Sequence, residues 1–229
     1  MKSTQGGRKL AACFAISPIF GLSLLCAAQT GKVESIGPLT DSSVPRAVLE
    51  TLEAKGYRLT LDEPAPACEL WIRKSVPAQP KKDKDIEGLA YPQLAESTLV
   101  GVIRFSQPAA DFRGQRIPAG FYTLRYELIP DDGNHLGVAP NRDFLLLVPA
   151  ASDADPKAQF KFNELVALSR EATGTKHPGP LSLAQADGIV TAAAVSKDDQ
   201  DHWIFSAPVK LASGDEIPMA LVVRGRAQQ

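Results

Sequence analysis

The sequence predicts a mainly β fold, an antiparallel β-sandwich of the jelly-roll kind, preceded by a small extension of one helix and two strands. Three observations predict it. The chain of 229 residues holds 18 prolines and 17 glycines, which favours many short elements joined by turns. Apolar and polar residues alternate over several short stretches, as they do in half-buried strands. No period of 20 to 50 residues recurs, which excludes solenoids and propellers.

Residues 1–28 are predicted to be an export signal. Lys2, Arg8 and Lys9 precede an apolar run at residues 10–25, and small side chains follow it. This run is shorter than the ~20 residues that a membrane-spanning helix needs. We therefore expect the mature chain to have no transmembrane span and to work in the periplasm or outside the cell.

The cleavage site is predicted after Ala28, at the end of the small residues. An alternative is a lipid anchor on Cys26, because the residues before it resemble a bacterial lipobox. Leu25 stands where a lipobox usually carries a small residue. The sequence therefore favours cleavage and leaves lipidation as the second interpretation.

Residues 29–95 are predicted to form the α+β extension. A helix is expected at residues 44–56, because Pro45 suits a first helical turn and Gly56 suits the position after the last one. Two strands follow it, at residues 57–61 and 69–73. We expect the helix and the strand pair to pack on the main sheet.

Residues 96–229 are predicted to form the sandwich. Strands are expected at residues 98–105, 121–128, 143–149, 181–183, 189–193, 202–205, 209–212 and 217–224, and a short helix at 163–170. The continuous apolar character of residues 143–149 indicates burial on both faces. The final turn is expected at residues 213–216.

The strand at residues 121–128 shows the clearest alternation of side chains. One face carries Phe121, Thr123, Arg125 and Glu127, and the other carries Tyr122, Leu124, Tyr126 and Leu128. We expect the second set to face the core. The Pro-Ala-Gly corner before this strand ends in Gly120, which can adopt a positive φ that larger residues resist.

Residues 113–124 read Arg-Gly-Gln-Arg-Ile-Pro-Ala-Gly-Phe-Tyr-Thr-Leu, and Phe-Ser-Gln-Pro precedes them at 105–108. These two segments resemble the signature of an uncharacterised secreted bacterial family, domain of unknown function 2911. The resemblance covers only this part of the chain. It implies a β-sandwich of unknown activity and brings no catalytic residues.

Charge and cysteine content exclude several classes of protein. After removal of the leader, 22 Lys and Arg stand against 26 Asp and Glu, a net charge of −4. No basic stripe exists beyond a short mixed run at residues 81–84, so we expect no nucleic-acid partner. Only Cys68 remains in the mature chain, where it is expected to be a small buried hydrophobe.

The three histidines give no local metal motif. His135, His177 and His202 lack the spacing of zinc ligands, and no cofactor is expected. A site assembled from distant residues remains the alternative interpretation. It would be a periplasmic hydrolase or metalloenzyme built from His135, His177 and Asp143.

Four aromatic residues are the candidate binding residues: Trp71, Tyr122, Tyr126 and Trp203. They would form a ligand platform if several of them shared an exposed face, whereas core packing is the ordinary fate of sandwich aromatics. With an export signal and no local catalytic motif, the sequence favours a non-enzymatic binding or structural module of the cell envelope. Its ligand or protein partner there is unknown.

Overall fold

The computed structural model describes residues 31–63, 66–79, 89–130, 141–186 and 188–227. In chain order the elements are β1 (Lys32–Ile36), α1 (Arg46–Leu49), β2 (Gly56–Thr60), β3 (Pro66–Ile72), β4 (Leu99–Phe105), β5 (Ala109–Ala110), β6 (Arg116–Ile117), β7 (Gly120–Leu128), β8 (Asp143–Pro149), the 3-10 helix η1 (Ala150–Ser152), α2 (Phe162–Thr173), β9 (Pro180–Ala184), β10 (Ala194–Lys197), β11 (Trp203–Lys210) and β12 (Glu216–Arg224). None of these helices is long and apolar enough to cross a membrane.

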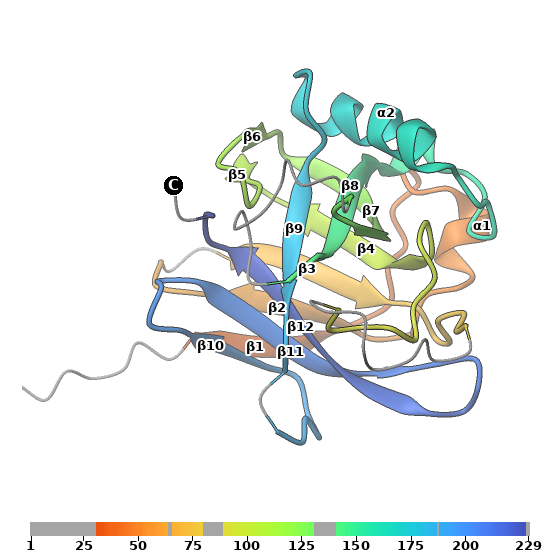
Figure 1. The fold of residues 1–229 in the computed structure, drawn as a ribbon. Helices are drawn as coiled ribbons and strands as arrows, with labels where there is room; N and C mark the ends of the chain where they lie inside the picture. The colour runs from red at the N-terminus through yellow and green to blue at the C-terminus, as the bar shows by residue number, and fades with distance from the viewer. Residues whose placement is uncertain (1–30, 64–65, 80–88, 131–140, 187, 228–229) are drawn as a thin grey trace, which may run out of the picture.

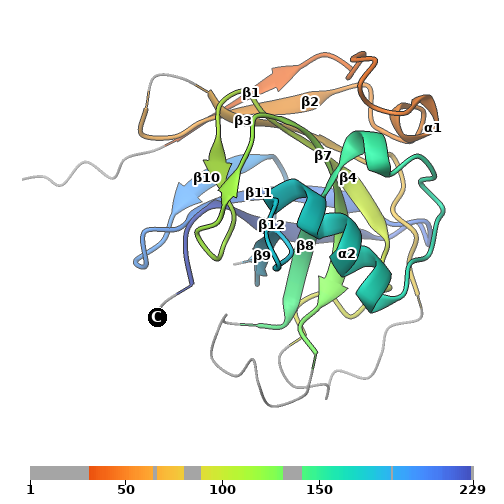
Figure 2. The same ribbon diagram turned by 90° about the horizontal axis from the view of Figure 1, so that it is seen from above.

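Ten strands form one antiparallel sheet in the order β1-β2-β3-β4-β7-β8-β9-β12-β11-β10. The sheet curls until its two end strands, β1 and β10, lie beside each other, so the fold is barrel-like and nearly closed (Figures 1 and 2). No ladder joins β1 to β10 among the described residues. The gap between β1 and β10 is closely packed instead. Gly31, just before β1, lies so near β10 and β11 that a Cβ atom added to it would be only 2.7 Å from the side chain of Val195 and 2.9 Å from that of Trp203.

The interior of the curled sheet is a single hydrophobic core. It draws inward-facing residues from strands that are far apart in the chain, such as Leu70, Leu124, Leu145 and Phe205. On β7, the predicted core face is confirmed, because Tyr122, Leu124 and Tyr126 belong to this cluster and Leu128 packs against it. Alternation with a period of two side chains therefore determines which face of each strand is inside.

Two segments cover the outer face of the sheet on one side. The chain around α1 packs Val44, Val48 and Leu52 on Trp71 and Leu99. Helix α2 packs Leu165 and Val166 on Leu146 and Val148 of β8. Both helices lie outside the sheet and away from β10 (Figure 1). The strands between them are therefore buried on both faces, as the apolar run of β8 predicts.

The structure confirms the mainly β, antiparallel class and modifies its details. A sandwich of two sheets is not confirmed, because the ladders run without interruption through all ten strands. The strands predicted for the N-terminal extension are β2 and β3 of this same sheet rather than a separate layer upon it. Pairing of β3 with β4 joins them to it, with Glu69 opposite Arg104.

The predicted helix at 44–56 is much shorter in the structure. Helix α1 spans Arg46–Leu49, and Leu52 then forms a β-bridge with Arg73. The backbone N–H of Glu53 donates to Ile72 O at 2.9 Å, so this part of the chain follows the sheet instead of the helix. Non-local backbone pairing outweighs the local helical preference here.

Four other predicted elements differ from the structure in kind or in extent. The strand predicted at 189–193 is wrong, and β10 begins at Ala194. The two strands predicted at 202–205 and 209–212 are one strand, β11, in which Pro208 pairs with Pro218 of β12. The predicted helix at 163–170 is confirmed and extends further in both directions, as α2. Residues 81–84 lie outside the described part of the chain.

Candidate functional site

The four aromatic residues predicted to bind a ligand lie in the protein's interior. Trp71, Tyr122, Tyr126 and Trp203 are at most 5% exposed. Trp71 packs in the cluster under α1 and donates from Nε1 to Gly37 O at 3.0 Å, and the other three belong to the main core. None of them presents a ring face to solvent. The ligand platform, which required several of these rings on one exposed face, is therefore not formed.

The structure does not bring His177 and Asp143 together, and His135 lies outside the described residues. Asp143 begins β8, whereas the chain just after His177 joins β8 through the bond from Leu147 N to Gly179 O. Four residues of strand separate the two points, about 13 Å at the usual rise. Among the described residues, no group of three potential ligands could hold a metal ion.

Asp143 serves a structural network instead. Its buried carboxylate accepts from the backbone N–H groups of Ala90 and Tyr91, at 2.8 and 3.0 Å, and from the Tyr126 hydroxyl at 2.6 Å. The Tyr91 hydroxyl in turn donates to Ala184 O and accepts from Ala220 N. These bonds fasten the segment before β4 to the strands β7, β8, β9 and β12.

His202 holds the C-terminal segment in place. Its ring is 5% exposed, with Nδ1 3.0 Å from Asp198 Oδ2 and Nε2 3.0 Å from Arg226 O. The ring also lies beside Phe112, with 5.5 Å between ring centroids. Ala227 N donates to Phe112 O, so the last described residues are tied to the loop that follows β5.

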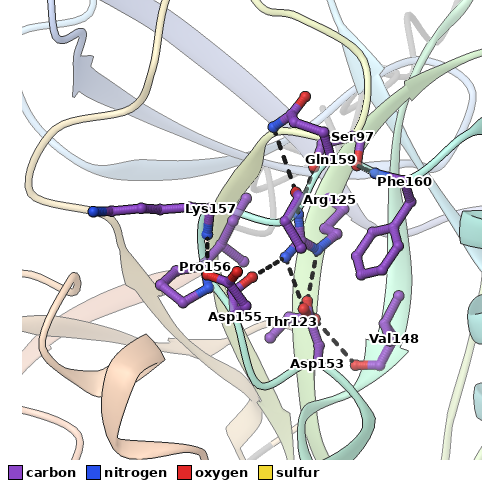
Figure 3. A network of polar contacts seen from close by, with 12 residues as sticks. Ser97, Thr123, Arg125, Val148, Asp153, Asp155, Pro156, Lys157, Gln159 and Phe160 are labelled. Atoms are coloured by element: carbon purple, nitrogen blue, oxygen red, sulfur yellow. Dashed lines mark hydrogen bonds and ion pairs between the residues drawn. The ribbon is translucent and has the colours of Figure 1, made fainter.

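The most extensive polar network of the described residues centres on Arg125, which the sequence analysis placed only on one face of a strand (Figure 3). Arg125 and Asp153 both have wholly buried side chains. Nε and one terminal nitrogen of Arg125 donate to the two carboxylate oxygens of Asp153, each at 2.7 Å. Thr123 Oγ1 donates to the same carboxylate at 2.6 Å.

Backbone carbonyls take the remaining donors of Arg125. These are the carbonyls of Ser97, Asp155 and Ala158, at 2.7, 2.8 and 2.9 Å. The guanidinium also lies over the ring of Phe160, 4.8 Å from its centroid. A guanidinium has five N–H donors, and all five are used here. The network therefore clamps residues 153–160 onto the outer face of β7 and leaves no donor of Arg125 for a ligand.

A second charged group crosses the outer face of β2, β3 and β4. Glu69 accepts from Arg58 at 2.7 Å and from Arg104 at 2.9 Å. Burial opposes ionisation of Glu69, but the hydrogen bonds from the two guanidiniums outweigh it and hold the pKa of this carboxyl below its usual range. Such a cross-strand ladder stabilises the sheet.

Glu127 lies two residues beyond Arg125 on the same outer face of β7. It is 3% exposed, and its Oε1 accepts from Leu128 N at 3.0 Å. Burial, together with the carboxyl of Glu96, raises the pKa of Glu127 to about 7. Its side chain therefore changes charge near neutral pH, unlike an ordinary surface glutamate.

One solvent-open hollow lies on the outer face of the sheet at the side without helices, and we call it the neutral hollow. It has a volume of about 330 Å³. It is bordered by Gln185, Ala186 and residues 189–192 of the connection, and by the sheet residues Ala194, Ser196, Ile204, Ser206 and Ala220. None of these described lining residues carries a formal charge. Ile189 in the connection is 92% exposed.

Sequence reasoning missed both the Arg125 clamp and the neutral hollow. A signal for the clamp existed, because a lone arginine stands in a strand whose neighbours are apolar and two aspartates follow β8 at 153 and 155. The hollow had no such signal, because residues 189–193 read as a strand. Comparisons with models of known protein families, with curated proteins and with solved structures found no match.

Proposed function

We propose that this chain is an exported, non-enzymatic binding module of the cell envelope. The neutral hollow would be its contact surface for an uncharged, extended segment of another envelope protein. The exposure of Ile189 beside this hollow carries the proposal. Among the described residues only Ile189 and Phe162 are large hydrophobic side chains left exposed, at 92% and 38%. Apolar surface at a hollow is typical of an interaction site.

The lining of the neutral hollow supports an uncharged occupant. A charged group placed there would lose hydration without gaining a counter-charge from the described lining residues, which is unfavourable. The small side chains of Ala194, Ser196 and Ser206 allow a peptide backbone to approach closely. The hydroxyls of Ser196, Ser206 and Thr191 offer neutral donors and acceptors to its amide groups. These properties favour a neutral peptide over an anionic glycan or a nucleic acid.

A site-specific photocrosslinker at position 189 tests the binding surface in growing cells. We expect a crosslink to one defined envelope protein from position 189 and none from position 162, the matched exposed site outside the hollow. The Ala194→Glu variant, which places a charge in the hollow, should abolish the crosslink while the melting temperature changes little. Equal crosslinking from both positions, or an unchanged crosslink in Ala194→Glu, contradicts the proposal.

Direct binding of purified protein gives a second test. Residues 29–229 would be probed against an array of neutral octapeptides and a matched array that carries one Glu or Lys in each peptide. We expect neutral sequences to bind and their charged counterparts to bind at least ~10-fold more weakly, about 1.4 kcal/mol. Turnover of a hydrolase substrate panel with no peptide binding would point to the enzyme alternative.

Export itself is tested by the mass of the protein recovered from the periplasm or medium. A mature chain that begins at Gln29 supports cleavage after Ala28. A diacylglyceryl adduct on Cys26 would support the lipid anchor instead. A chain that keeps Met1 and stays in the cytosol contradicts the proposed location.

A further inference from the structure

Arg73 stands immediately after β3, at the edge of the segment that the Arg125 clamp holds. Its backbone N–H donates to Val100 O at 2.9 Å, which places its Cα on the sheet. Its side chain is only partly exposed and reaches Leu99 O and Pro156 O from one terminal nitrogen, at 3.5 and 3.3 Å. Both distances are long for a charged donor, so these contacts hold the guanidinium loosely.

No ion pair neutralises Arg73 among the described residues. The adjoining segment carries the buried Asp153, whose two oxygens accept from Arg125 and Thr123, and the exposed Asp155. Among the described residues, no carboxylate oxygen lies within 4.0 Å of a nitrogen of Arg73, the limit for an ion pair. Burial, followed by the positive charge of Arg125, lowers the pKa of Arg73 from its ordinary value. A partly buried cation without an ion-pair partner favours a nearby anion.

The free donors of Arg73 are accessible to such an anion. Nε and the second terminal nitrogen have no partner among the described atoms, while every buried side-chain nitrogen or oxygen of the described residues has one. Neither of these two nitrogens is therefore fully buried. Nε and a terminal nitrogen together form the planar fork that binds two oxygens of a carboxylate or phosphate.

We propose that Arg73 is an anion-binding residue, and that a carboxylate or phosphate group docks between the end of β3 and residues 155–157. Two lysines flank this position. Lys74 follows Arg73, with Nζ 3.0 Å from Glu50 O, and exposed Lys157 follows Pro156. The site is distinct from the neutral hollow, whose lining comes from residues 185–220. It therefore adds a charged contact to a module that otherwise binds a neutral segment.

NMR of the unmodified mature chain provides the first test. The Nε–H resonance of Arg73 would be followed during separate titrations with inorganic phosphate and with acetate, at constant ionic strength in chloride. We expect a saturable shift of this resonance and no comparable shift for Arg104, which already has Glu69 as its partner. A response to acetate alone indicates a carboxylate ligand, a response to phosphate alone indicates a phosphate group, and a response to both indicates a site that accepts either oxyanion. No saturable shift with either anion overturns the proposal.

Thermal melting of matched variants provides the second test. Phosphate should raise the melting temperature of the wild-type chain above its value in chloride, because a ligand stabilises the state that it binds. Arg73→Gln should remove this increment and Arg104→Gln should keep it. Arg73→Lys, which retains the charge without the fork, should bind phosphate roughly 10-fold more weakly. Equal increments in Arg73→Gln and the wild type would refute the proposal.

Discussion

Arg125 and Asp153 form a two-bond ion pair, with 2.7 Å in each bond and no solvent exposure of either side chain. The pair joins the middle of β7 to a segment 28 residues further along the chain. Breaking such a pair from one side leaves a charge buried without a partner, which costs more than the pair contributes when intact. The packing of residues 153–160 on the outer face of β7 therefore depends on the carboxylate of Asp153.

We expect Asp153→Ala to lower the free energy of unfolding by about 3–5 kcal/mol, because the guanidinium of Arg125 would remain buried without its carboxylate. Urea denaturation followed by circular dichroism measures the loss. The control is Glu50→Ala, which removes an exposed ion pair with Arg46 and should cost less than about 1 kcal/mol. A cost for Asp153→Ala as small as that of the control would show that the clamp contributes little.

Glu127 should make stability depend on pH near neutrality. Its pKa is about 7 in the folded chain and has the ordinary value of 4.5 when unfolded. The stability that Glu127 contributes is therefore fully present below pH 4.5 and is lost as the pH rises through about 7. We expect Glu127→Gln to exceed the wild type by about 3 kcal/mol at pH 8 and to differ from it by less than about 0.5 kcal/mol at pH 4.5. A difference that does not change with pH contradicts this assignment.

Tyr126→Phe removes the hydroxyl that donates to the buried carboxylate of Asp143 at 2.6 Å. We expect a loss of about 1–3 kcal/mol, because a buried charged acceptor keeps only its two backbone donors. Tyr122→Phe is the matched control in the same strand, since its hydroxyl donates to the carbonyl of Pro118 near the surface. Equilibrium unfolding of both variants gives the comparison, and equal losses would mean that Asp143 does not depend on this hydroxyl.

Gly101 lies where the pairing of β4 with β7 shifts register. A Cβ atom there would lie 2.4 Å from the backbone oxygen of Trp71, so β3 and β4 could not keep their spacing. We expect Gly101→Ala to cost about 1–3 kcal/mol. Gly37→Ala, where a Cβ would meet nothing within 4 Å, should cost less than about 0.5 kcal/mol. Melting temperatures of the two variants test the difference.

Cys68 should be unreactive in the folded protein. It is 1% exposed, and burial raises the pKa of its thiol, so very little of the reactive thiolate is present. An aromatic disulfide reagent at pH 8 should not label the native mature chain and should label one thiol per chain in guanidinium. Rapid labelling of the native chain would show that the strand β3 opens readily.

The strand faces were predictable from the sequence because a period of two residues is a local property. The alternation over β7 identified Tyr122, Leu124 and Tyr126 as core residues, and the continuous apolar run of β8 indicated burial on both faces. The helix α2 was also predicted, and its apolar residues share one face in the structure. These patterns need no knowledge of what each strand pairs with.

The candidate sites were not predictable in the same way. The clamp joins Arg125 to Asp153 and to carbonyls of a separate loop, and Arg73 reaches a carbonyl 83 residues further along the chain. Trp203 read as a possible ligand contact, and only the curling of the sheet places it inside. Residues 189–193 have strand-like composition but do not pair, and residues 189–192 border the neutral hollow.

The sequence alone therefore determined the secondary-structure class and the buried face of its clearest strands, since local alternation decides both. Only the tertiary structure decided that ten strands form one nearly closed sheet and that Arg125 is buried with a carboxylate partner. It also decided that Arg73 is partly buried without an ion-pair partner among the described residues. Burial and charge balance depend on which distant segments meet in space. That meeting is set by strand order and register rather than by any short stretch of residues.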